Sequence, residues 1–108
     1  MREFEMEDKT KNTPENTDVS RRVQQTVRHE LKIWPQFYKE VFYGRKNFEI
    51  RKNDRDFEVG DFLVLREFDI SKNEYTGASV MRKITFILHG NQFVIEEGYC
   101  VMSITGQF

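Results

Sequence analysis

The sequence has few of the residues on which disulfide frameworks, metal centres and membrane spans depend. Its single cysteine, Cys100, excludes an internal disulfide, and its two histidines, His29 and His89, have no spacing typical of a metal site. No apolar run approaches the roughly 18 residues that cross a bilayer, and the N-terminus lacks the apolar core of a signal peptide. We therefore expect a cytoplasmic protein with no metal, no cofactor and no membrane partner.

An excess of charge of either sign is also absent. The chain has 17 basic and 18 acidic residues, which gives a formal net charge of -1. A protein with this balance does not attract nucleic acid as a whole, so any such binding has to come from a local patch. The sequence contains neither a glycine-rich phosphate loop nor the GxSxG motif of serine hydrolases.

What the sequence does contain is enough apolar surface for one core. Its length of 108 residues predicts a single domain. Residues 1–26 have few large apolar side chains and a mixture of charged, Asn and Thr residues, which predicts a flexible N-terminal tail. Residues 27–108 carry nearly all of the aromatic residues and are predicted to form the domain.

Apolar and polar residues alternate in a way that predicts five short strands, at 27–33, 47–51, 62–68, 80–88 and 99–104. A helix is predicted between the first two, because Pro35 suits a first helical turn and Gly44 suits a helix end. Residues 69–79 are predicted to be a polar hairpin connection. These elements predict an α+β fold that is mostly β, a small antiparallel barrel with one main helix packed beside it.

The apolar side of each element gives the candidate core. The helix is predicted to bury an aromatic-rich stripe made of Phe37, Tyr38, Val41 and Phe42. In the strand that follows, Phe48 and Ile50 are predicted to face the core, which leaves Glu49 and Arg51 on the opposite face. The strand at 80–88 is predicted to place Val80, Ile84, Phe86 and Leu88 on one face. His29 is predicted to be a hydrogen-bonded core histidine, and Cys100 an inert core thiol.

Residues 44–51 bring a helix end, a strand start and four ionised side chains together. Across residues 44–55 there are two acidic residues against five basic ones, a local net charge of +3; the basic residues are Arg45, Lys46, Arg51, Lys52 and Arg55. Arginine offers a planar fork and lysine a mobile charge, which together suit an RNA backbone or a single nucleotide. Glu49 adds an acceptor for a base amino group, or a group that orients Lys46 and Arg51. The alternative is an ordinary surface pair of Glu49 with Arg51, worth about 0 to 1 kcal/mol.

The spacing of Gly44, Lys46, Glu49 and Arg51 resembles the GxKxxExR signature of ASCH domains, which belong to the PUA-like barrel superfamily. The sequences HELKI at 29–33 and FEIRKNDR at 48–55 are similar to a small uncharacterised branch of the DUF3850 type. The resemblance implies a module that binds RNA or a nucleotide-like ligand in a cleft between helix and barrel. It implies that Lys46, Glu49 and Arg51 line the cleft, and we expect Arg45, Lys52 and Arg55 to flank it as backbone contacts.

The resemblance leaves two other functions open. Some small ASCH proteins are amidohydrolases that act on acylated cytidine, and those relatives place a threonine nucleophile where this chain has Glu49. A carboxylate can act as a base for water, but it does not replace the acyl-enzyme route of a threonine. The other open function is a regulatory protein-interaction module that uses an exposed strand face. A non-catalytic binding module is the favoured hypothesis, with no catalytic residue assigned.

Overall fold

The computed structural model describes residues 26–108, and the predicted tail at 1–26 lies outside these residues except for its last one. The chain forms one helix and five strands in the order β1 (Arg28–Ile33), α2 (Pro35–Phe42), β2 (Phe48–Lys52), β3 (Phe62–Asp69), β4 (Glu74–His89) and β5 (Tyr99–Thr105). All five predicted strands and the predicted helix are present. Among the described residues, no helix has the length and apolar character needed to cross a membrane.

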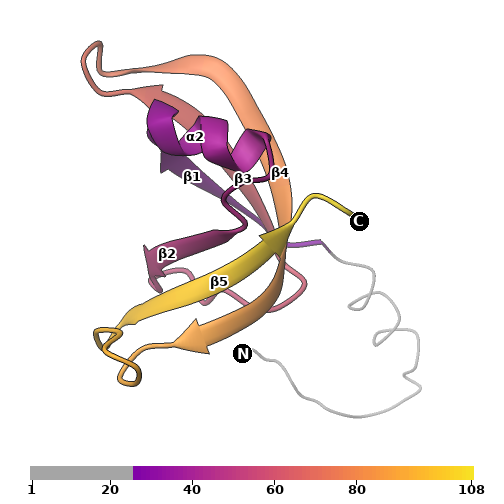
Figure 1. Cartoon of the computed structure of the whole chain (residues 1–108), viewed down its shortest axis with the longest axis vertical. Helices are drawn as coiled ribbons and strands as arrows, with labels where there is room; N and C mark the ends of the chain where they lie inside the picture. The colour runs from indigo at the N-terminus through magenta and orange to yellow at the C-terminus, as the bar shows by residue number, and fades with distance from the viewer. Residues whose placement is uncertain (1–25) are drawn as a thin grey trace.

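The strands form one five-stranded sheet in the order β1-β3-β4-β5-β2. β1 pairs with β3 in parallel, because the chain crosses over through α2 and β2 between them, and the other three pairings are antiparallel. The sheet curves into a half-barrel with α2 packed against it (Figure 1). The mostly β prediction is confirmed, with the difference that the sheet is mixed and that β1 and β2 are its two edges.

The long strand β4 joins the two halves of the sheet. It pairs with β3 along its first part and with β5 along its second part, so both halves share one continuous backbone (Figure 1). The prediction that residues 69–79 form a connection is wrong in extent, because β4 already begins at Glu74.

The pairing register shifts between Ile84 and Phe86, and this irregularity turns Phe86 outward. The prediction that Phe86 shares a face with Ile84 is therefore wrong, because Ile84 is buried and Phe86 is exposed; Ile87 is buried in its place.

The core draws on both halves of the sheet and on α2. Its buried hydrophobic residues come from all of the elements except β2, with Phe57 added from the segment before β3: Leu31, Ile33, Val41, Phe57, Leu63, Leu65, Ile84, Ile87, Cys100, Met102 and Ile104. His29 is hydrogen-bonded as predicted, since its Nε2 lies 2.8 Å from Asp61 Oδ2 and its ring packs edge-on against Phe57. The side chains of both partners are largely buried.

The helix ends where its sequence indicates. Gly44 has a φ of +78°, a left-handed conformation that glycine adopts without strain, and its N–H donates to the Val41 carbonyl. The backbone N–H groups of Arg45 and Lys46 both donate to the Glu40 carbonyl, at 2.9 Å. This turn fixes where the chain leaves α2 and sets Lys46 just before β2.

The predicted burial of the helix is mostly wrong. Only Val41 is buried and Tyr38 packs against the core, whereas Phe37 and Phe42 are exposed. A helix of eight residues covers only a narrow strip of the sheet, so the aromatic residues on either side of that strip remain at the surface. Phe37 is consequently available to line a pocket.

The faces of β2 are the reverse of those predicted. Phe48 and Ile50 point outward and are 44% and 59% exposed, while Glu49 is only 3% exposed. Alternation in a sequence separates two faces of a strand but does not say which of them is inside. Here the inner face is charged because Glu49 has two cationic partners that compensate its burial.

Candidate functional site

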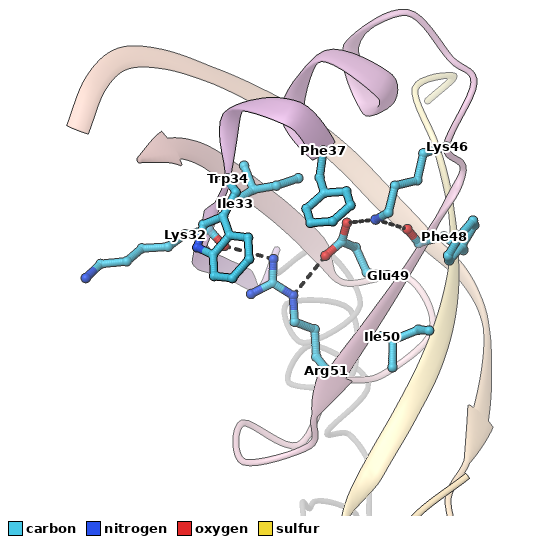
Figure 2. Close-up of a pocket in the computed structure, with 9 residues that line it drawn as sticks. All are labelled: Lys32, Ile33, Trp34, Phe37, Lys46, Phe48, Glu49, Ile50 and Arg51. Carbon is cyan, nitrogen blue, oxygen red and sulfur yellow. Dashed lines mark hydrogen bonds and ion pairs between the residues drawn. The ribbon is translucent and has the colours of Figure 1, made fainter. Parts of the chain in front are cut away.

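A pocket of about 610 Å³ lies between the start of α2, the end of β1 and strand β2. We call it the Glu49 pocket (Figure 2). Its lining combines three aromatic, two aliphatic and four charged residues: Lys32, Ile33, Trp34, Phe37, Lys46, Phe48, Glu49, Ile50 and Arg51. An apolar pocket with a few convergent polar groups is the usual form of a small-molecule site.

Glu49 is the central polar group of this pocket. Its Oε2 accepts a hydrogen bond from Lys46 Nζ, and its Oε1 accepts one from Arg51 Nε at 2.8 Å (Figure 2). Lys46 Nζ also donates to the Phe48 carbonyl at 2.8 Å. Glu49 is the one buried charged residue among residues 26–108, and both of its oxygens have a cationic partner. Such pairing is what allows a carboxylate to remain ionised out of water.

Arg51 connects the pocket to the opposite edge of the sheet. Its Nη2 donates to the Lys32 carbonyl on β1 at 2.9 Å, in addition to the bond from its Nε to Glu49. Arg55 makes a similar link, because its Nη1 donates to the Glu30 carbonyl at 2.6 Å. The two arginines therefore join β2 and the segment after it to β1, although these strands are not paired in the sheet.

Aromatic side chains form the walls of the pocket. Trp34 and Phe37 lie nearly parallel, with ring centroids 6.2 Å apart and an interplanar angle of 24°. Lys46 Nζ lies 4.8 Å from the centre of the Phe48 ring and 5.9 Å from that of Phe37. The cation is thus held by both a carboxylate and aromatic faces, which are each favourable for an ammonium group.

The structure brings together three of the six predicted site residues. Lys46, Glu49 and Arg51 meet in the pocket, and the alternative of a surface pair is wrong because the Glu49 side chain is buried. Arg45, Lys52 and Arg55 do not line the pocket. Arg45 is paired with Glu40 on the surface, Lys52 is exposed at the end of β2, and Arg55 contacts β1.

The Arg45–Glu40 pair is a surface ion pair of two parallel hydrogen bonds. Arg45 Nε and Nη2 donate to the two Glu40 oxygens at 2.8 and 3.1 Å. The hydrogen bond from Arg45 holds the pKa of Glu40 below its usual value, and the same bond raises the pKa of Arg45. Arg45 is therefore engaged by Glu40 near the end of α2, and it is not among the residues that line the pocket.

Sequence reasoning missed the aromatic half of the site. Trp34, Phe37 and Phe48 line the pocket, yet the amphipathic pattern placed Phe37 and Phe48 in the core. Lys32 contributes its backbone rather than its ammonium group, since its side chain extends away from the pocket in Figure 2 and its Nζ lies 4.2 Å from the Phe68 ring centre. One sequence signal could have indicated these aromatic residues. The helix is short, so it cannot bury all of the aromatic side chains that it carries.

Other reactive groups lie outside this pocket. Within residues 26–108, no cluster of three or more His, Cys, Asp or Glu side chains could hold a metal ion. Cys100 is fully buried, and this burial raises the pKa of its thiol. The Glu49 pocket is accordingly the candidate site.

Two comparisons with known proteins bear on the chain. The model of a family described as "Domain of unknown function (DUF3850)" matches residues 28–104, from the first residue of β1 to the next-to-last residue of β5. The chain is also similar to an uncharacterised 12.9 kDa protein in the GpA 3' region of Escherichia phage P2. The two are 39% identical over 57 residues, which is 53% of this chain. The matched stretch is 50% of that relative, so the chain spans about half of its length.

Proposed function

The chain belongs to the DUF3850 family, and from this premise we propose that it is a non-catalytic module of the ASCH, PUA-like kind. Its proposed ligand is RNA or a nucleotide-like molecule, bound in the Glu49 pocket. One observation carries the proposal: a carboxylate that is 3% exposed lies in an open, aromatic-walled pocket with a cation on each oxygen. A purely structural ion pair has no need of such a pocket.

The groups in the pocket match the parts of a nucleotide. Flat aromatic walls offer stacking surfaces for a base. Arg51 has five N–H donors and, within the described residues, gives hydrogen bonds to Glu49 and the Lys32 carbonyl, so it has donors left for phosphate or base oxygens. The Glu49 carboxylate can accept from a base amino group, which a site built only for phosphate would not require.

The arrangement favours binding over the amidohydrolase alternative. Among the residues that line the pocket, none carries a hydroxyl or a thiol that could form an acyl-enzyme. Glu49 occupies the position of the threonine nucleophile of the resembling enzymes, and both of its oxygens accept hydrogen bonds from cations. As a base, Glu49 would take up a proton and so lose its ion pairs with Lys46 and Arg51.

The test is binding of a single-stranded RNA pool by fluorescence polarisation over a series of salt concentrations. With about three phosphate contacts, log K should fall with log salt at a slope near -2. Lys46→Ala and Arg51→Ala should each weaken binding by about tenfold, because each removes a charged hydrogen-bond donor. Lys39→Ala is the matched control, since Lys39 is an exposed cation of α2 that does not line the pocket. Equal affinities for the wild type and both pocket variants would exclude this site.

A further inference from the structure

We infer that the Glu49 pocket continues past Trp34 into a second compartment, so that the preferred ligand is a single-stranded chain of at least two nucleotides. This inference rests on the proposed function and makes it more specific. It distinguishes a protein that binds a nucleic-acid chain from one that binds a free mononucleotide.

The second compartment has a volume of about 430 Å³ and lies between the start of α2 and the turn after β3. It is lined by Trp34, Pro35, Gln36, Asp69, Ile70 and Ser71. Trp34 lines this compartment and the Glu49 pocket alike, and it is 47% exposed. In Figure 2 its indole lies on the opposite side of the Glu49 pocket from Lys46. Trp34 therefore borders both hollows.

A shared aromatic wall suits consecutive bases. Proteins that bind single-stranded nucleic acid place successive bases against aromatic side chains, and such stacking tolerates any base because each has a flat face. Ile70 adds an exposed aliphatic side chain to the lining of the second compartment. A base that enters there would have both Ile70 and Trp34 available as apolar contacts.

The turn that closes this compartment is held in place before any ligand binds. Asp69 Oδ1 accepts hydrogen bonds from the Ser71 hydroxyl at 2.7 Å, the Ser71 N–H at 3.0 Å and the Lys72 N–H at 3.3 Å. These bonds fix the position of Ile70 between them, and a wall that is already ordered costs less to use on binding. The Asp69 carboxylate also repels phosphate, so a base rather than a phosphate group is the part that fits here. The phosphate between two nucleosides is then left on the outer side, within reach of solvent.

The single tryptophan of the chain gives a direct assay, because Trp34 is the only source of indole fluorescence. Its emission is recorded while the protein is titrated with the four nucleoside 5'-monophosphates and with dinucleotides of the same bases. A second stacked base should strengthen binding by about fivefold or more. Ile70→Ala should remove most of this gain and leave mononucleotide affinity unchanged. Val59→Ala, an exposed aliphatic residue before the opposite end of β3, is the matched control and should change neither affinity.

The outcomes separate this inference from the proposed function. If mononucleotides bind as tightly as dinucleotides, or if Ile70→Ala weakens both equally, the second compartment is not a nucleotide site and the Glu49 pocket alone remains. If neither class of ligand changes the fluorescence or is retained in equilibrium dialysis, both proposals are wrong. Ile70 is exposed, so its truncation leaves the core intact and a loss of binding cannot be attributed to unfolding.

Discussion

Replacing Glu49 by glutamine tests whether the charged group of Lys46, Glu49 and Arg51 in the pocket stabilises the fold as a buried ion pair would. The change keeps the side-chain volume and removes the charge, so Lys46 and Arg51 each lose an ionised partner. Removing one member of a fully buried ion pair costs about 3 to 5 kcal/mol, whereas an exposed pair is worth about 0 to 1 kcal/mol. The Lys46 and Arg51 side chains are 18% and 24% exposed and can recover some hydration. We therefore expect Glu49→Gln to lower the free energy of unfolding by about 2 kcal/mol, between those two limits.

The assay is urea unfolding followed by Trp34 fluorescence and by far-ultraviolet circular dichroism. Coincident transitions and an unchanged m-value would show that the loss is one of stability. In a thermal melt, the same loss corresponds to a fall in Tm of about 8 to 16 °C for a domain of this size. Glu40→Gln is the matched control, because it removes the carboxylate of the exposed Arg45 pair, and it should leave both midpoints unchanged. A cost for Glu49→Gln below about 0.5 kcal/mol would refute the reasoning, since the pair would then behave like a surface one.

Three further predictions concern the core and the chemistry of the site. Phe57→Ala should lower the free energy of unfolding by about 3 to 5 kcal/mol in the same urea assay, because Phe57 is buried against His29 and its loss leaves a cavity. The Cys100 thiol should resist a thiol reagent at neutral pH until the domain unfolds, because it is fully buried and its pKa is raised; rapid labelling of native protein would contradict this placement. Incubation with N4-acetylcytidine should give no deacetylation, and turnover that disappears in Glu49→Gln would instead establish a water-based amidohydrolase.

Local sequence signals predicted the elements of the fold well. Pro35 and Gly44 marked the two ends of the helix because each meets a backbone requirement that few other residues satisfy. Hydrophobic alternation located every strand, although it placed the start of β4 six residues late. The missed residues, 74–79, are polar or small except for Tyr75, and they are extended because the pairing with β3 continues through them.

The orientation of the elements could not be predicted in the same way. Hydrophobicity predicts that Phe48 and Ile50 face inward, but in the structure the opposite face of β2, which carries Glu49, is the buried one. This orientation depends on distant contacts. Arg51, for example, donates to a carbonyl on β1 that is 19 residues away in sequence. The shift between Ile84 and Phe86 likewise depends on how β4 meets β5. The charged half of the pocket was found because Lys46, Glu49 and Arg51 lie within six residues. Its aromatic half depends on how little of the sheet the helix covers.

The two arginine bridges to β1 have a consequence for the behaviour of the molecule in solution. A strand with only one neighbour presents backbone groups on which another chain can build, which is a route to aggregation. Strand β1 is such a strand. Two of its carbonyl groups, those of Lys32 and Glu30, accept hydrogen bonds from the charged side chains of Arg51 and Arg55. A ligand that draws Arg51 away from β1 would uncover one of these acceptors. The tendency of the domain to associate through β1 would then depend on whether its pocket is filled.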